Sequence, residues 1–304
     1  MRYRLNIGGE PPPVQMSGPD WLVGVTVWPD LDTYGICAHP NFGKGVYADV
    51  DAWTQKVADL GVWGFRGGVA AQLDTVQRTA VRARELGLKW LGIVATEQTT
   101  EQQLRANLDF VKANADVFVG VEGINEPDGD GLTQAEVDKT VRFQKLIFDY
   151  VQTNRLGLPV LSPALRRPAG PNLYQRFVDA GIRGTFDAVS LHHYQRDGLI
   201  EHLDMVCGVW GCDRVWVTET GYTTATESTD PRRATENQAA LAAIPHLLQS
   251  LAEPRVEKMF RYELLDDAAP LTNNEAHFGV YRADGSPKPE VAEILRFTRP
   301  EAGP

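Results

Sequence analysis

Eight short apolar segments recur along the chain at intervals of about 30 to 40 residues. Most of them are continuous runs of Val, Leu, Ile and aromatic residues, a pattern typical of strands that are covered on both faces. The predicted strands are residues 21–27 (WLVGVTV), 62–68 (VWGFRGG), 89–95 (KWLGIVA), 117–124 (VFVGVEGI), 159–165 (PVLSPAL), 186–194 (FDAVSLHHY), 215–222 (VWVTETGY) and 256–265 (VEKMFRYELL).

The stretches between these segments carry apolar residues at helical spacing, with Arg and Glu on the opposite side. Thr133 followed by Glu136 forms a capping box, which predicts that a helix begins there. The clearest predicted helices cover residues 72–87, 133–153, 232–251 and 288–297.

A strand and a helix in alternation, repeated eight times, predict an α/β fold: a (β/α)8 TIM barrel in a single domain. The competing fold, a doubly wound open sheet, should show a Gly-rich phosphate turn after its first strand. Residues 24–35 (GVTVWPDLDTYG) contain no such turn. We therefore expect a lead-in at residues 1–20, the barrel at 21–298 and a tail at 299–304.

Composition excludes several classes of protein. The 304 residues include 30 Lys+Arg and 40 Asp+Glu, and this net charge of −10 argues against a nucleic-acid-binding chain. A hydrophobic fraction of 43% fits a globular core, and the apolar runs are too short to span a membrane. The N-terminal sequence MRYRLNIGGEPPP lacks the apolar stretch of a secretory signal, so we expect a cytoplasmic chain or export by another route.

Polar residues stand where the predicted strands end. In a barrel of this type the carboxyl ends of all eight strands meet at one face, where active sites form. Loops 28–48 and 266–280 follow the first and last strands and could roof a cleft there. The candidate residues are Arg66, Asn125, Glu126, His192, Tyr194, Glu219, Tyr262 and Glu263.

Glu126 and Glu219 are the most informative of these residues, because each ends a strongly apolar strand where a carboxylate is expected only if it faces the barrel mouth. Their strands are three apart in the ring, so the two side chains can converge. Two convergent carboxylates can act as an acid and as an ionised base or nucleophile. Cleavage of a glycosidic bond needs this pair, and it needs no metal or cofactor.

The motifs INEP at residues 124–127 and TETG at 218–221 resemble those of the clan A glycoside hydrolases. This resemblance implies that Glu126 is the acid/base, that Glu219 is the nucleophile, and that the anomeric configuration is retained. It also implies supporting roles for other residues. Asn125 would bind the sugar's 2-hydroxyl, Arg66 would keep the nucleophile ionised, and the family's H-x-Y pattern maps onto His192 and Tyr194.

Strand eight departs from the family 5 pattern, since Tyr262 and Glu263 stand where a Trp platform is usual. The segment ELLDD followed by EAHFG is closer to family 39-like members. Trp28 is then the best candidate for stacking on a sugar ring. Arg166 and Arg167 follow strand five, and they either bind an acidic or branched glycan or belong to a solvated loop.

The predicted partner is a carbohydrate, an oligosaccharide or polysaccharide, and two other functions stay open. One is a carbohydrate-binding barrel without turnover. The other is a metal-dependent barrel in which Glu126, Glu219, His192 and an Asp are ligands. Arg66 disfavours this hypothesis, because its charge would lie close to the metal. The sequence indicates neither the oligomeric state nor the sugar, and it does not decide whether Cys207 and Cys212 pair.

Overall fold

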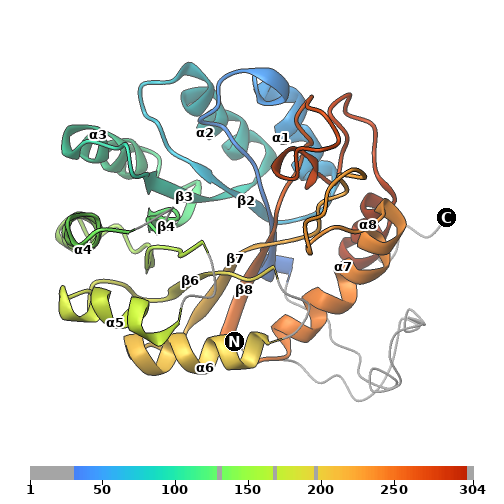
Figure 1. Cartoon of the computed structure of the whole chain (residues 1–304). Coiled ribbons are helices and arrows are strands. Elements are labelled where there is room, and N and C mark those ends of the chain that lie inside the picture. Colours follow the sequence, from blue (N-terminus) through green and yellow to red (C-terminus); the bar gives the residue numbers. More distant parts are fainter. Residues whose placement is uncertain (1–30, 129–131, 167–169, 195–197, 300–304) are drawn as a thin grey trace, which may run out of the picture.

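The structure, a computed structural model, describes residues 31–128, 132–166, 170–194 and 198–299. These residues form a (β/α)8 TIM barrel, so the predicted fold class is confirmed. Figure 1 shows the strands at the centre of the molecule and the helices arranged around them. The strands are β1 (Tyr34–Cys37), β2 (Gly64–Gly68), β3 (Lys89–Ala95), β4 (Phe118–Ile124), β5 (Val160–Leu161), β6 (Val189–His192), β7 (Val215–Thr220) and β8 (Val256–Arg261).

Eight α-helices of the described chain follow the strands in turn, and short 3-10 turns add to the loops. The helices are α1 (Val50–Asp59), α2 (Asp74–Leu86), α3 (Glu101–Ala113), α4 (Gln134–Thr153), α5 (Pro171–Asp179), α6 (Leu199–Trp210), α7 (Glu236–Leu251) and α8 (Pro289–Thr298). The 3-10 turns are η2 (Leu31–Thr33), η3 (Gly45–Tyr47) and η4 (Glu275–His277).

All neighbouring strands pair in parallel, in the order β5-β4-β3-β2-β1-β8-β7-β6. A bridge between Leu161 and Ala188 joins the β5 and β6 edges, and the amide of Ser162 donates to the carbonyl of Ala188 at 3.0 Å. The ring is therefore nearly closed. Its parallel direction places the carboxyl end of every strand at one face of the barrel.

The first strand of the ring was predicted wrongly. Residues 21–27 were expected to form it, but β1 pairs with both β2 and β8. Residues 21–27 and Trp28 lie outside the described residues, and the predicted domain boundaries stay a prediction. The sequence of β1, YGIC, has a weak strand pattern because it contains Gly35. A glycine is required at this position, since a Cβ would lie 2.7 Å from the ring of Phe260. Close packing, rather than propensity, sets this strand.

The barrel interior below the carboxyl face is filled with apolar side chains. Six buried residues from alternate layers form this interior cluster: Cys37, Leu91, Leu161, Ala188, Trp216 and Phe260. A larger core lies between the strands and the surrounding helices. The interior cluster gives the polar side chains above it a rigid, dry floor.

The helix starts agree with the predicted capping. Thr133 and Glu136 make the reciprocal contacts of a capping box at the start of α4, as predicted. Thr100 and Thr235 form equivalent boxes at α3 and α7, each with a Gln. Such caps satisfy backbone donors that would otherwise be unpaired, and each stabilises its helix by about 1 kcal/mol.

The three cysteines are free thiols, so Cys207 and Cys212 do not pair. Among the described residues, no helix combines the length and the apolar character that crossing a membrane requires.

Candidate active site

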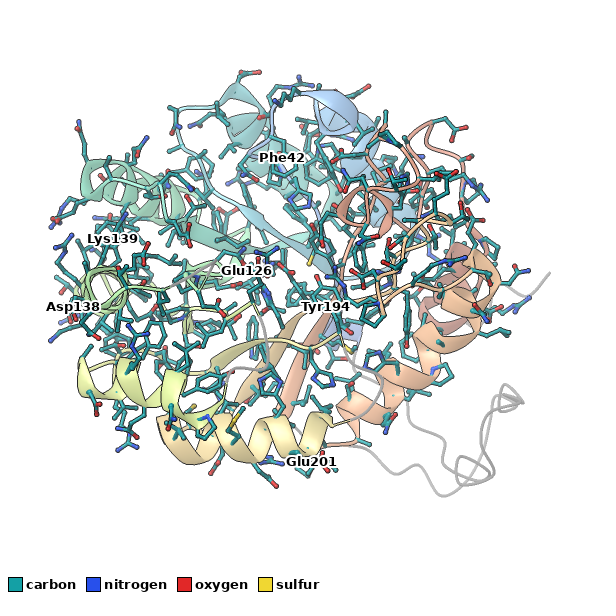
Figure 2. All side chains as sticks on the ribbon, in the orientation of Figure 1. Phe42, Glu126, Asp138, Lys139, Tyr194 and Glu201 are labelled. Carbon is teal, nitrogen blue, oxygen red and sulfur yellow. The ribbon has the colours of Figure 1, made fainter. Side chains whose placement is uncertain are left out.

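A cavity of about 580 Å³ opens at the carboxyl face of the barrel. Figure 2 shows Glu126 and Tyr194 near the centre of the ring, whereas Asp138, Lys139 and Glu201 lie on the outer helices. The loops after β1 and β8 contribute residues to the wall of the cavity, as predicted. The lining includes His39, Phe42, Arg66, Asn125, Glu126, Arg166, Tyr194, Glu219, Arg232, Tyr262 and Glu275.

Arg66 is the centre of a buried charge network at the cavity floor. Its side chain is only 2% exposed, and it donates from Nε and Nη2 to the two carboxylate oxygens of Glu122, at 2.6 Å each. Nη1 donates to Oε1 of Glu219 at 2.6 Å, and Nη2 also reaches Oδ1 of Asn125 at 2.6 Å. The planar guanidinium thus holds three groups from two other strand ends in fixed positions.

Glu122 was not predicted as a site residue. It is completely buried within β4, and its carboxylate neutralises part of the charge of Arg66. The sequence signal was an acidic residue inside the apolar run FVGVEGI, because an ionisable group in such a strand is expected only with a buried partner.

Glu219, near the end of β7, is surrounded by groups that stabilise its charge. Oε2 accepts a hydrogen bond from the hydroxyl of Tyr194 at 2.7 Å, and Oε1 accepts from Arg66. Burial raises the pKa of this carboxyl, but His192, Arg66 and Tyr194 outweigh that effect and hold the pKa below its ordinary value. Glu219 is therefore ionised at neutral pH.

Glu126 lies two residues after the end of β4 and is less buried, with 30% of its side chain exposed. Its amide donates to the carbonyl of Ala164 at 2.8 Å, and its φ of 47° is in the left-handed region. A non-glycine residue in this region is strained, and such strain is found at functional sites. A carboxylate oxygen of Glu126 lies within 4.8 Å of one of Glu219, so the two predicted carboxylates do converge.

His192 lies between the two carboxylates. Its Nδ1 is 2.9 Å from Oε1 of Glu126, and its Nε2 is 3.3 Å from Oε1 of Glu219. Burial lowers the pKa of this imidazole, but Glu219 and Glu126 together raise it above its ordinary value. The next residue, His193, is buried on the other side of the strand, near His202 and His246. Only His192 of the two histidines thus contacts the carboxylates, as strand alternation predicts.

Tyr262 and Glu263 follow β8 and occupy different depths. Tyr262 lines the cavity, whereas the buried Glu263 lies behind His39 and contacts its Nε2 through Oε2 at 2.6 Å. Burial raises the pKa of Glu263 despite the opposing effect of His39. His39 was missed in the sequence because it follows β1, which was placed too early.

Aromatic side chains border the cavity, although the predicted platform Trp28 lies outside the described residues. Phe42 is 45% exposed, and its ring stacks on His39 at a centroid distance of 4.3 Å. Tyr194 packs edge-on against Tyr262, and the guanidinium of Arg232 lies 5.2 Å from the Tyr194 ring. The exposed face of Phe42 is the aromatic surface best placed to contact a ligand at the mouth.

Within the described ranges, Glu126, His192 and Glu219 form a group that could ligate a metal, since one ligand atom from each lies within 4.8 Å of the others. Arg66 works against this possibility. Its guanidinium contacts Oε1 of Glu219 at 2.6 Å and approaches Nε2 of His192 to 3.3 Å. A divalent cation held there would face a buried positive charge at short range, so these groups fit a metal poorly.

Comparison with protein families gives the class of the protein. Residues 95–289 match the family described as glycosyl hydrolase catalytic core. The chain belongs to this family. A comparison with curated proteins found no match.

Solved structures share the fold at low sequence identity. A family 39 glycoside hydrolase from Bacteroides cellulosilyticus WH2 has a TM-score of 0.65 and 18% identity, covering 90% of this chain. The present chain spans 64% of that protein. GH5_18 from Streptomyces cattleya, in complex with GlcNAc, gives 0.63 and 15% identity over 90% of this chain and 81% of the other. A GH128 endo-β-1,3-glucanase from Amycolatopsis mediterranei, in complex with laminarihexaose, gives 0.54 and 16% over 86% and 98%.

Proposed function

We propose that the protein is a retaining glycoside hydrolase that cleaves O-glycosidic bonds of a polysaccharide or cell-wall glycan by double displacement. Glu219 is the nucleophile and Glu126 is the acid/base. The observation that carries the proposal is the approach of the two carboxylates to within 4.8 Å across one cavity, in unlike environments.

In the first displacement, a carboxylate oxygen of Glu219 bonds to the anomeric carbon, and the bond from that carbon to the leaving oxygen breaks. Glu126 gives its proton to the leaving oxygen. In the second, Glu126 removes a proton from water, the water oxygen bonds to the anomeric carbon, and the ester to Glu219 breaks. Glu126 ends protonated and Glu219 ends ionised, so both groups return to their starting states.

The surroundings of the two glutamates support this division of roles. A nucleophile must be ionised, and Glu219 has Arg66 at 2.6 Å and the Tyr194 hydroxyl at 2.7 Å. Among the described residues, no lysine or arginine lies closer to a carboxylate oxygen of Glu126 than Arg166, at 4.0 Å. Glu126 is also the more exposed of the two, which suits a group that exchanges protons with water.

The separation of the carboxylates favours retention over inversion. An inverting enzyme needs about 6.5–9.5 Å between its carboxyl groups to admit a water, whereas retaining enzymes have about 5–5.5 Å. The closest oxygens of Glu126 and Glu219, within 4.8 Å of each other, are nearer than inversion requires.

Other groups in the cavity suit binding of sugar hydroxyls. Oδ1 of Asn125 is occupied by Arg66, which leaves its amide NH2 to donate to a 2-hydroxyl. His39 and Tyr262 offer further polar contacts, and the exposed ring of Phe42 offers a surface for a sugar's CH face. The carbohydrate complexes of the GH5_18 and GH128 relatives support a carbohydrate as the ligand.

Hydrolysis of a panel of aryl glycosides and polysaccharides by wild type and by Glu219→Gln tests the proposal. Wild type should cleave at least one member, and proton NMR should show a first product with the substrate's anomeric configuration. Glu219→Gln should be inactive but still bind the ligand, whereas Glu293→Gln, on α8 and far from the cavity, should retain full activity. An inverted first product, or an active Glu219→Gln variant, would refute double displacement at this residue.

Covalent labelling tests the nucleophile directly. A 2-deoxy-2-fluoro glycoside of the cleaved sugar should inactivate wild type and add its glycosyl mass to the peptide that contains Glu219. A label on another residue would overturn the assignment.

A further inference from the structure

We propose that the cavity accepts a glycan with an anionic substituent, a carboxylate or a sulfate, on its leaving-group side, where the guanidinium of Arg166 binds that group. This inference rests on the proposed role of Glu126, because the acid that protonates the leaving oxygen must face the leaving group. Arg166 lines the same cavity, and its Nε lies 4.0 Å from Oε2 of Glu126.

Arg166 is held in place by its backbone. Its amide donates to Oδ1 of Asp128 at 2.7 Å, and two residues earlier Ala164 accepts the amide of Glu126 at 2.8 Å. These two hydrogen bonds tie the loop after β5 to the loop after β4. The start of the Arg166 side chain therefore keeps a constant position beside the acid/base.

Arg166 differs from the other arginines of the cavity in how its charge is paired. Arg66 is saturated by Glu122 and Glu219. Arg232 is likewise paired, with Asp230 and Glu275 at 2.7 Å each. The Arg166 side chain makes no hydrogen bond within the described part of the chain, and 46% of it is exposed.

The lack of a hydrogen-bonded partner for Arg166 becomes important at one stage of the catalytic cycle. When Glu126 carries the proton for the leaving oxygen, its carboxyl group is neutral, and Arg166 then has no negative partner among the described cavity residues. A guanidinium offers a planar pair of donors that matches a carboxylate or sulfate. An anionic group on the leaving sugar would supply the missing partner.

The charge of the whole chain limits the size of such a ligand. With a net charge of −10, the protein repels a long polyanion, so one acidic sugar beside the scissile bond fits better than a continuous acidic polymer. The expected substrate is a glycan in which acidic residues occur singly or in short stretches.

The kinetic test uses two aryl glycosides of the sugar that wild type cleaves best, one with 4-nitrophenol and one with 3-carboxy-4-nitrophenol as the leaving group. The measured quantity is the ratio of kcat/KM for the carboxylated substrate to that for the plain one. Arg166→Gln should lower this ratio about ten-fold, the loss expected for one charge-assisted contact at a partly exposed site. Arg166→Lys should keep part of it.

The matched control is Arg105→Gln, since Arg105 is an exposed arginine of α3 with a carboxylate partner in Glu101. This variant should leave the ratio unchanged. An unchanged ratio in Arg166→Gln overturns the proposal, even if both rates fall together, because that result assigns Arg166 to orienting Glu126 alone.

A binding measurement separates this proposal from the proposed hydrolysis. Calorimetry would compare Glu219→Gln with Arg166 retained or changed to Gln, using short oligouronates, sulfated disaccharides and neutral cello- and laminari-oligosaccharides. An anionic ligand should bind about ten-fold more weakly without Arg166. Comparing the oligouronates with the sulfated disaccharides shows whether the site prefers a carboxylate or a sulfate. If wild type cleaves nothing while this difference holds, the hydrolase proposal and the leaving-group position fail, but the anion site at Arg166 stands. If hydrolysis is found but no anionic ligand depends on Arg166, only the anion site fails.

Discussion

Replacing Arg66 by methionine tests the charge network beneath the cavity. Arg66 is 2% exposed, and its contacts at 2.6 Å reach Glu122, Glu219 and Asn125. The variant would leave two buried carboxylates without their cation. Removing one partner of a buried ion pair costs about 3–5 kcal/mol, so we expect the free energy of unfolding to fall by about that amount.

Activity should respond through the ionisation of Glu219. Arg66 is one of the groups that lower the pKa of this carboxyl, so its loss should raise that pKa and move the acid limb of the kcat/KM profile to higher pH. A carboxyl with a lowered pKa stabilises the fold above its unfolded pKa of about 4.3 and loses that contribution as the pH falls. The variant should therefore also show a smaller loss of stability in acid.

The double variant Arg66→Met with Glu122→Gln separates stability from catalysis. It removes the excess buried charge, so urea unfolding should recover about half of the lost free energy, while the shifted acid limb should stay. If the free energy of unfolding of Arg66→Met alone lies within about 1 kcal/mol of the wild-type value, the charge network does not stabilise the fold. An acid limb that does not move would refute the assigned effect on Glu219.

Other groups give three further predictions. His202 and His246 have pKa values lowered to about 4, by burial and by the nearby His193. The unfolded chain binds more protons than the folded one between this value and about 6.5. Each histidine should therefore destabilise the fold by about 2 kcal/mol at pH 5 relative to pH 7. In the double variant His202→Gln with His246→Gln, the free energy of unfolding from urea titrations should depend less on pH. Tyr194→Phe removes the 2.7 Å hydrogen bond to Glu219 and should lower kcat about ten-fold with KM little changed, measured on the best aryl glycoside. Glu126→Gln should lose activity mainly on substrates with poor leaving groups, and added azide should yield a glycosyl azide of retained configuration; an inverted azide would contradict its role as acid/base.

Much of the fold was predictable because local signals agreed with tertiary packing. β3 was predicted at its observed bounds, since Lys89–Ala95 is a compact apolar run between two helical stretches. The capping box at Thr133 marked the start of α4 for a similar reason, because its signal is contained in four consecutive residues.

The misplacement of β1 shows where such signals fail. Its four residues include a glycine required by the ring of Phe260, which comes from the other end of the chain. No local pattern encodes that contact. His39 was missed as a consequence, because its importance depends on which strand it follows.

The carboxylate pair could be predicted because both glutamates stand at the carboxyl ends of apolar strands, Glu219 within β7 and Glu126 just after β4. The bridging position of His192 could not, because it depends on the side-chain geometry around Arg66. The apolar strand around Glu122 indicated a buried partner but not that this partner is Arg66. Sequence identifies which residues reach the carboxyl face, and packing decides which of them touch.

The left-handed backbone of Glu126 has a consequence for the stability of the chain. A glycine would adopt its φ of 47° without strain, and relief of such strain is worth about 1 kcal/mol. The glutamate at this position therefore lowers the stability of the fold. The same backbone conformation directs a carboxylate toward Glu219, which is what the proposed reaction requires.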